Sequence, residues 1–314
     1  MPGLPLIIDC DPGVDDAIAL LLAIAAKEAL EVLAITTAAG NVGGDLTARN
    51  ACRVREIASR PDIPVFAGMD RPLSREPVGA DHFHGVSGLG DLPVLAPARG
   101  PETRHAVDYL VETLRSRPPG EVTLALMGPM TNLAEAMRRA PDIIPRIRRV
   151  VAMGGARREG GNITASAEFN IFADPHAADV VVRSGVDLAL LGLDVTHQVT
   201  ATEARRRRIS ELAGASAAAV SRLLAFSAGT EARLGTGGPP PLHDPCVILA
   251  LLDPDAFHFR PCALAIETSS LLTLGHTAVE FRVGPERPAN VDWAVDADSD
   301  RAFDLIYRLL GQAA

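Results

Sequence analysis

Short apolar runs rich in β-branched residues alternate with longer helical patterns along this chain, and this alternation limits the folds that it can adopt. The predicted strands are 6–9, 32–38, 122–127, 149–153 and 187–193. Helical patterns cover 15–26 and 45–59, and another begins near Asn132. Strands that alternate with helices form βαβ units, with parallel strands and helices on both faces of the sheet. The sequence therefore predicts an α/β fold with an open, mostly parallel sheet covered on both faces.

The chain shows no sign of an internal boundary. It has 314 residues, of which 47% are hydrophobic and 22% charged, an ordinary globular composition. We find no repeat, no low-complexity tract and no Pro/Gly/Ser-rich linker, and we expect a single domain over 1–314. The longest fully apolar run, 17–26, is shorter than the ~20 residues of a membrane span. No basic region or cleavage site precedes the first strand, so we expect a cytoplasmic protein without a membrane partner.

The net charge and the spacing of the cysteines exclude further classes of protein. The net charge is −9, which argues against nucleic acid as a partner. The run Arg205–Arg208 is interpreted as a solvated helix face or turn, with a subunit contact or an anion site as the alternative. The four cysteines form no Cys-x-x-Cys pair, a spacing that suits neither zinc nor a disulfide-rich domain. We expect free buried thiols.

Three segments are longer than ordinary connections between strands and helices. They are 68–90, 154–170 and 229–241, each rich in glycine or proline. In open α/β sheets, ligands bind beyond the carboxyl ends of the strands. We therefore expect these segments to form the mouth of a ligand site.

An acidic cluster lies where the first strand passes into the first helix. Residues 9–16 read Asp-Cys-Asp-Pro-Gly-Val-Asp-Asp. Asp15 and Asp16 fall where helix capping and the helix dipole favour a negative charge, but capping does not account for Asp11. A hard cation with oxygen ligands does, and Ca²⁺ and Mg²⁺ are the candidates. An EF-hand loop is excluded, because Val14 and Leu20 stand where it needs glycine and glutamate.

The Asp-x-Asp ending of the first strand also resembles the haloacid dehalogenase-like phosphatases. In such an enzyme, Asp9 and Asp11 would be nucleophile and acid. That family uses a downstream lysine, whereas the only lysine here, Lys27, belongs to the first helix. A phosphatase is therefore the alternative prediction.

The whole series of motifs resembles the inosine–uridine-preferring nucleoside hydrolase family. Its signature is an Asp-x-Asp-Pro-Gly-x-Asp-Asp segment, matched here at 9–16. Further matches follow in family order: Thr-Thr-Ala-Ala-Gly-Asn-Val at 36–42, Met-Gly-Pro-Met-Thr-Asn-Leu-Ala at 127–134, Met-Gly-Gly at 153–155, Gly-Asn at 161–162, Ala-Glu-Phe-Asn at 167–170 and Leu-His-Asp-Pro at 242–245. The resemblance implies an enzyme of nucleoside breakdown that hydrolyses ribonucleosides to free base and ribose.

The resemblance also implies Ca²⁺ as the cofactor. Its ligands would be Asp11, Asp16, Asp244 and the main-chain oxygen of Met127, a set that suits a hard ion. Asp11 would in addition accept a proton from the attacking water, which makes it the catalytic base. Asp15 would bind the ribose 2′-hydroxyl, and Asp244 would lie against the ribose as well as the metal.

Further polar residues are implied at the sugar and the base. The remaining ribose hydroxyls would be bound by Asn41, Asn162, Glu168 and Asn170. His243, which precedes Asp244, would protonate the leaving base. His84 matches a mobile loop histidine of the family, and it is the alternative proton donor. Its neighbour His82 has no counterpart, and we interpret it as an exposed loop residue.

At the end of the site that would hold the nucleobase, this sequence differs from family members that stack purines between aromatic rings. The only tryptophan, Trp293, lies in a predicted strand, and the helix expected to face the base, 221–234, carries no tyrosine. These departures favour a pyrimidine-preferring or broad enzyme over a purine-specific one. They also leave open a catalytically silent binder of nucleosides or ribose. The family resemblance implies a homo-oligomer, a tetramer or a dimer.

Overall fold

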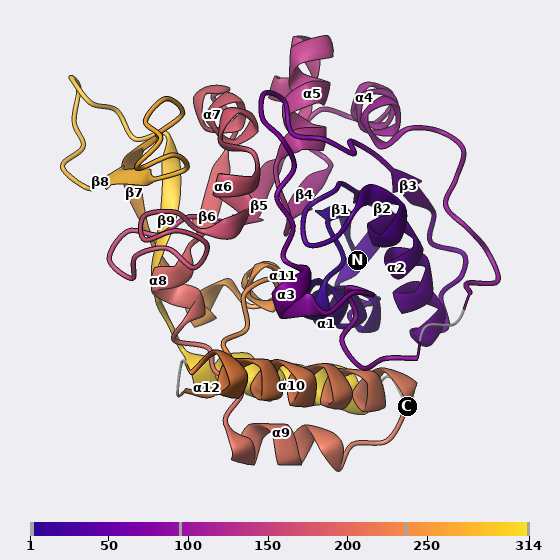
Figure 1. Ribbon diagram of the computed structural model, residues 1–314. Coiled ribbons are helices and arrows are strands. Elements are labelled where there is room, and N and C mark those ends of the chain that lie inside the picture. Colours follow the sequence, from indigo (N-terminus) through magenta and orange to yellow (C-terminus); the bar gives the residue numbers. More distant parts are fainter. Residues whose placement is uncertain (1–2, 94–95, 236–237, 313–314) are drawn as a thin grey trace.

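The computed structural model describes residues 3–93, 96–235 and 238–312, and these form a layered α/β structure around one large sheet (Figure 1). Within the described residues the sheet has nine strands in the order β3-β2-β1-β4-β5-β6-β9-β7-β8. The strands are β1 Leu4–Cys10, β2 Leu30–Thr37, β3 Val65–Ala67, β4 Thr123–Leu126, β5 Arg149–Met153, β6 Leu188–Leu191, β7 Phe257–Ile266, β8 Thr277–Glu280 and β9 Val291–Ala297.

The predicted mostly parallel α/β sheet is confirmed. All pairs from β3 to β9 are parallel, whereas β7 runs antiparallel to both β9 and β8. At this edge the sequence analysis predicted only the strand that contains Trp293, which is β9, and assigned none to β7 or β8. The residues of this edge alternate between buried and exposed positions, because the edge is covered less completely than the centre.

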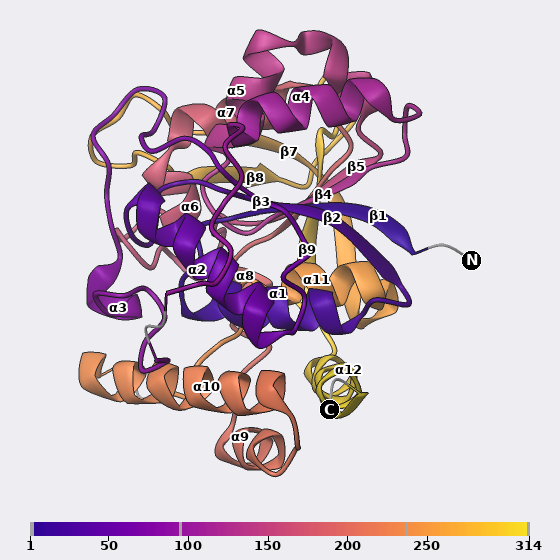
Figure 2. The same ribbon diagram turned by 90° about the vertical axis from the view of Figure 1, so that its right-hand side faces the viewer.

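Helices cover both faces of the sheet, as predicted (Figure 2). On β1, Leu6 and Ile8 join one core and Ile7 joins the other, because successive side chains of a strand point to opposite faces. The first core is shared with α1 Val14–Ala25, α2 Gly44–Ile57, α10 Ala215–Leu234, α11 Pro245–Leu252 and α12 Ser299–Gln312. The second is shared with α4 Ala106–Ser116, α5 Thr131–Arg139 and α7 Pro175–Arg183.

The first helix is buried on nearly every side, as its sequence indicates. Positions 17–23 of α1 are almost inaccessible to solvent. The helix packs against the sheet and against α2, α10, α11 and α12, so no face of it needs polar residues. Lys27, which the sequence analysis assigned to this helix, lies in the turn after it.

The arginine run lies on an outer helix, in agreement with the interpretation as a helix face, and two of its four side chains also contact a neighbouring helix. It lies on α9 Glu203–Ser210, which packs outside α10 and α12. Arg205 pairs with Asp300 and lies over the ring of Phe303, and Arg208 lies over the ring of Tyr307. Two of the four arginines thus attach α9 to α12 through cation–π contacts. The four cysteines are free and buried, as predicted.

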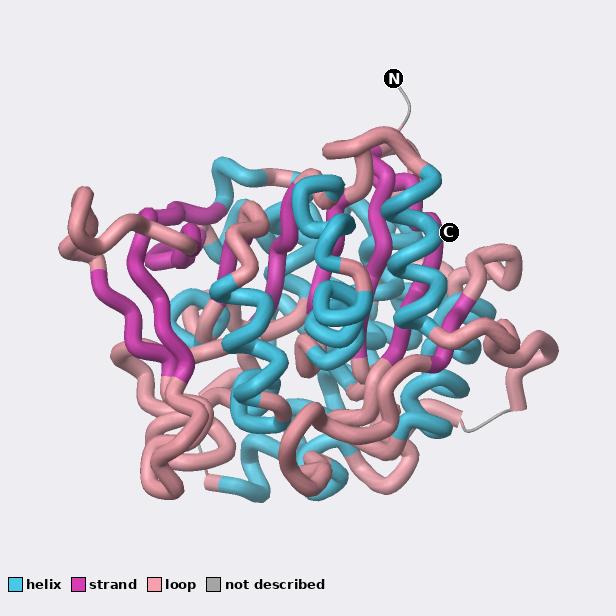
Figure 3. Tube along the Cα trace, turned by 90° about the horizontal axis from the view of Figure 1, so that it is seen from above, coloured by secondary structure: helices cyan, strands magenta, loops and turns pink. Residues whose placement is uncertain are grey.

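The long loops gather at one end of the strands (Figure 3). Segments 68–90 and 154–168 are irregular apart from the short helix α3 Asp81–His84. The predicted loop 229–241 overlapped the predicted helix 221–234, and the structure confirms the helix, because α10 continues through Gly229 to Leu234. The helix ends at Gly235, whose φ of +74° is the left-handed conformation that glycine adopts readily. Residues 236–237 of that loop lie outside the described residues. No described helix combines the length and apolarity needed to cross a membrane.

Candidate active site

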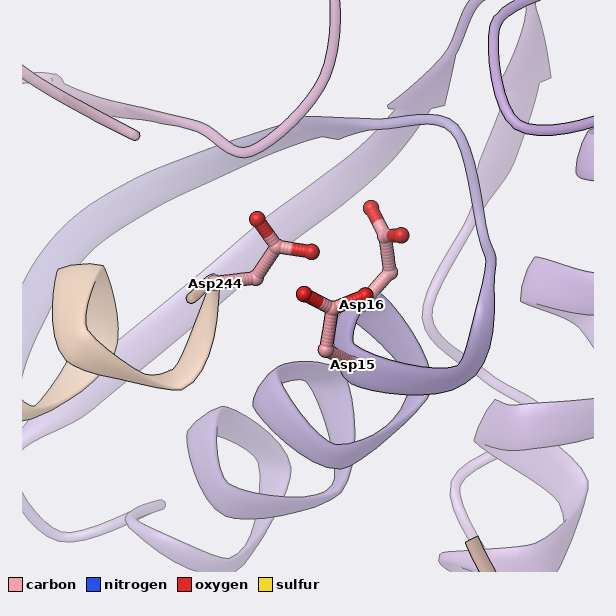
Figure 4. A group of neighbouring side chains, drawn as sticks. All are labelled: Asp15, Asp16 and Asp244. Atoms are coloured by element: carbon pink, nitrogen blue, oxygen red, sulfur yellow. The ribbon is translucent and has the colours of Figure 1, made fainter. Parts of the chain in front are cut away.

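Three carboxylates from distant parts of the chain meet at the carboxyl end of β1. Asp15 and Asp16 begin α1, and Asp244 precedes α11 (Figure 4). Each offers an oxygen within 4.8 Å of those of the other two. Packing of α11 beside α1 therefore brings the His-Asp-Pro motif to the acidic turn. In the described residues this group is a candidate metal site.

Asp11 lies beneath this group, fully buried, in a cradle of two loops. Its Oδ2 accepts a hydrogen bond of 2.6 Å from the backbone N–H of Asn41. Among the described residues, its Oδ1 has no hydrogen-bond partner. A Cβ atom at Gly40 would lie 2.0 Å from Oδ2, and one at Gly128 would lie 2.4 Å from Oδ1. Glycine is required at both positions, because any side chain would displace the carboxylate.

The electrostatics of this cluster fit a bound cation. Burial and the charge of Asp16 raise the pKa of Asp11 well above its usual value. Burial, then the neighbouring Asp15, raises the pKa of Asp16 to about 7. Burial and the nearby aspartates also raise the pKa of Asp244 well above its usual value. Crowded carboxylates with an unpaired buried oxygen form an oxygen-rich donor set for a hard divalent ion.

The other groups expected around the cation are close by. The main-chain oxygen of Met127 follows β4 and accepts a hydrogen bond of 2.9 Å from Asn170 Nδ2. Asp16 Oδ2 accepts hydrogen bonds from the Gly13 N–H at 2.9 Å and from Asn41 Nδ2 at 3.0 Å. The cluster of three carboxylates includes Asp15, which was predicted as a ribose ligand. The predicted division between metal and sugar ligands stays a prediction.

A cavity of about 630 Å³ opens directly above the acidic group. It draws residues from all three loop segments that the sequence singled out, which fits a ligand mouth at this end of the sheet. Most of the predicted site residues line it: Asp15, Asn41, His84, Met127, Asn162, Glu168, Asn170, His243 and Asp244. Asp11 and Asp16 do not line the cavity, because they lie buried below its floor.

One wall of the cavity is built on α6 Phe169–Ala173. Glu168 caps this helix by accepting hydrogen bonds from the N–H groups of Asn170 and Ile171, and it also accepts one from Gly155. Burial raises the pKa of Glu168 to about 7, although these three bonds oppose the shift. Asn162 Oδ1 accepts from the Phe169 N–H at 2.9 Å. The predicted sugar ligands thus also fix the loop that presents them.

The two predicted histidines come from different elements. His84 ends α3, and its Nδ1 accepts a hydrogen bond of 3.0 Å from the Val14 N–H, while burial lowers its pKa. His243 Nδ1 lies 2.9 Å from Thr196 Oγ1, and burial lowers the pKa of His243 to about 4. His82 is exposed and lines the cavity beside them.

Several cavity residues were missed by the sequence analysis. They are Phe83, Phe169, His197 and Thr200. The available signal was position, because His197 and Thr200 closely follow β6, at the strand end where ligands bind. Only Glu231 and Leu234 of the helix expected to face the base line the cavity. Phe226 instead lies against Gly85 and Gly90.

The phosphatase alternative is not supported by the position of Asp9. Its Oδ1 accepts hydrogen bonds from Thr36 Oγ1 at 2.5 Å and from Asn132 Nδ2 at 2.8 Å. Burial raises its pKa to about 6. These two hydrogen bonds anchor the Asp9 carboxylate between β2 and α5, which is a structural role and not that of a nucleophile.

Comparisons with known proteins agree on one family. The profile described as "Inosine-uridine preferring nucleoside hydrolase" matches residues 6–304. A pyrimidine-specific ribonucleoside hydrolase RihA from Shewanella sp. strain ANA-3 is 43% identical over 96% of this chain and 94% of its own length. The structure of a plant nucleoside hydrolase, PpNRh1, superimposes with a TM-score of 0.92 at 31% identity, covering 99% of both chains. A purine-preferring ribonucleoside hydrolase from Gardnerella vaginalis gives 0.91 at 29% identity, covering 98% of this chain and 99% of its own.

Proposed function

The chain belongs to the inosine–uridine-preferring nucleoside hydrolase family, and from this premise we propose that it hydrolyses ribonucleosides to free base and ribose with bound Ca²⁺. Family membership makes it an enzyme that cleaves N-glycosidic bonds. The observation that carries the proposal is the cavity itself, because its floor is acidic and its wall carries amides and a carboxylate at the spacing of the family motifs. Cleavage of a nucleoside requires both features side by side.

In this proposal, Asp11, Asp16, Asp244 and the main-chain oxygen of Met127 hold the cation. When bound, Ca²⁺ would supply a positive charge that orients water and ribose hydroxyls and lowers the pKa of that water. Asp11 then accepts the proton of the water that attacks the anomeric carbon. Its unpaired Oδ1 supports this role, because that oxygen has no competing donor among the described residues.

The sugar is held by residues of three loops. Asp15 binds the 2′-hydroxyl, and Asn41, Asn162, Glu168 and Asn170 bind the other hydroxyls. Carboxylates near the ring favour the positive charge that develops on the sugar as the bond breaks. The hydrogen bonds that fix Asn162 and Glu168 hold these groups in place before the substrate arrives, which lowers the cost of orienting it.

The base departs toward the part of the cavity lined by His243. This histidine, oriented by Thr196, hydrogen-bonds the leaving base and assists its departure. His84 is the alternative, but its Nδ1 is already engaged by a backbone N–H. We assign His243 the larger effect.

Base preference follows from the same end of the cavity. Neither tyrosine lines it, since Tyr109 stacks on Phe66 and Tyr307 lies under Arg208. Trp293 is buried against Gly155 and Gly192, away from the cavity. We propose a pyrimidine-preferring or broad specificity, which the similarity to a pyrimidine-specific relative supports.

A panel of ribonucleosides tests the proposal. We expect release of free base and ribose from uridine or cytidine at least as fast as from inosine, and loss of activity after chelation of Ca²⁺. A folded protein that hydrolyses no nucleoside, yet binds one in calorimetry, would select the silent binder instead. Phosphate release from a phosphomonoester, without nucleoside cleavage, would select the phosphatase.

Assembly is a separate part of the proposal. We propose a homotetramer or homodimer, as the family resemblance implies. Light scattering measures the mass directly, and a monomer at working concentration contradicts this part while leaving the catalytic proposal intact.

A further inference from the structure

A further histidine, His197, lines the cavity close to His243, and the mechanism proposed above gives it no role. His197 follows the short helix α8 Leu193–Thr196 and lines the same cavity as His243. The centroids of these two rings are 5.7 Å apart. Its neighbour Thr196 contacts His243, so this one turn of chain supports both imidazoles.

His197 is hydrogen-bonded to a carboxylate. Its Nδ1 lies 3.1 Å from Glu159 Oε2. An anionic oxygen at one ring nitrogen fixes the orientation of the ring and the nitrogen that carries the proton there. Within the part of the chain that the structure describes, Nε2 of His197 has no hydrogen-bond partner. That second nitrogen is therefore available for a hydrogen bond, and the residue lines the cavity.

The loop that carries Glu159 is held in place from the same helix. Asp194, which is buried, accepts hydrogen bonds from the N–H groups of Arg157 at 2.6 Å and Arg158 at 2.8 Å. Glu159 is the next residue, so the position of its backbone is set by α8. Residues 194–197 thus hold the backbone next to Glu159, carry its imidazole partner and contact His243.

His84 and His243, which line the same cavity, have hydrogen-bond partners of another kind. Nδ1 of His84 accepts from a backbone N–H, and Nδ1 of His243 contacts a hydroxyl. Among the described histidines that line the cavity, only His197 is hydrogen-bonded to a carboxylate. About a third of its side chain is exposed, so it can regain a proton from solvent after each turnover.

We propose that His197, backed by Glu159, is the group that donates a proton to the departing base, whereas His243, whose Nδ1 contacts Thr196, assists through a hydrogen bond and not as the proton donor that the family resemblance implied. The proposal rests on the nucleoside hydrolase function argued above. As water adds to the anomeric carbon, the bond from carbon to base nitrogen breaks and its electron pair passes to the base. The base takes a proton from Nε2 of His197, and the attacking water gives one to Asp11. Asp11 then releases its proton to solvent and His197 takes one up, which restores the enzyme. The sum is nucleoside plus water giving ribose plus base.

The test compares leaving groups in the Ca²⁺-loaded enzyme. His197→Gln removes the donor, and we expect it to lower kcat/KM on uridine, cytidine or inosine by about 100-fold, within the range of general acid catalysis. Nitrophenyl riboside, whose phenolate leaves without protonation, should change by less than about threefold on the same grounds. Glu159→Gln keeps an acceptor but removes the charge, so we expect a smaller loss, on the order of tenfold, on nucleosides only.

The control is His258→Gln, an exposed histidine on β7 that does not line the cavity, and both activities should be unchanged. Equal loss on both substrates in His197→Gln and Glu159→Gln would show a structural role and overturn the proposal. So would unchanged nucleoside turnover in both variants. If the unmodified protein cleaves neither substrate, the proposed function itself fails, which is a distinct outcome.

Discussion

At the scale of single residues, the chemistry divides between the floor of the cavity and its base end. The Asp11 carboxylate lies against Gly40 and Gly128, and its Oδ1 has no hydrogen-bond partner among the described residues. His243 lies at the opposite end of the reacting bond in the proposed orientation. Loss of one or the other should therefore affect different steps of the reaction.

Asp11→Ala should abolish activity on every substrate, nitrophenyl riboside included. It removes both a proposed cation ligand and the base, so neither water nor ribose is prepared for reaction. Steady-state rates on uridine and nitrophenyl riboside, with Ca²⁺ in excess, measure this. Full activity on nitrophenyl riboside would contradict the role assigned to Asp11.

His243→Ala should behave differently. It leaves the acidic floor intact and removes a polar contact to the base, so nucleoside turnover should fall by about 10²-fold or more. Turnover of nitrophenyl riboside should stay close to normal. If both substrates suffer equally, His243 instead positions Asp244, the residue that follows it.

At the scale of elements, α10 involves two glycines with different roles. Gly229 opened the predicted loop 229–241 but also belonged to the predicted helix 221–234; it lies inside the helix, and nothing lies within 4 Å of where its Cβ would be. The true end is Gly235, in the left-handed conformation. Gly229 therefore continues the helix, whereas Gly235 ends it.

Alanine substitutions should separate them. Gly229→Ala should stabilise the protein by about 0.5–1 kcal/mol, because alanine loses less backbone entropy and meets no neighbour. Gly235→Ala should destabilise it by about 1 kcal/mol, because a Cβ is strained at positive φ. Urea denaturation of the two variants measures both signs, and a stabilising Gly235→Ala would show that the helix end is placed wrongly.

At the scale of the whole molecule, the fold concentrates negative charge at one end of a sheet. A cation that binds only the folded chain stabilises it by mass action. Chelation should therefore lower Tm, and added Ca²⁺ should restore it in a concentration-dependent way. Asp16→Asn, which weakens the proposed site, should reduce this shift. Scanning calorimetry with and without chelator checks it, and an unchanged Tm contradicts a cation at this position.

Stability should also depend on the protonation of Glu168. Its pKa is about 7 in the folded protein against an ordinary value of 4.5. The folded state therefore holds the proton more tightly, and the stabilisation from this group is full below about pH 4.5 and lost as the pH rises through 7. Denaturation of Glu168→Gln should show a flatter decline across this window than the unmodified protein. Parallel pH profiles would contradict the raised pKa.

The sequence by itself determined the alternation of strands and helices, the burial of α1 and the acidic turn at 9–16. These features are local: periodicity and turn residues act over a few positions, so the printed order of residues is enough to read them. The same order, through its resemblance to a family, also predicted a set of site residues, most of which line the cavity.

Only the tertiary structure decided which distant residues meet. The approach of Asp244 to Asp16 depends on α11 packing beside α1, and the pairing of His197 with Glu159 depends on a loop fixed by Asp194. The antiparallel edge at β7 was likewise set by packing. Such contacts join segments far apart in the chain, and their geometry comes from burying apolar surface between layers, which no local pattern encodes.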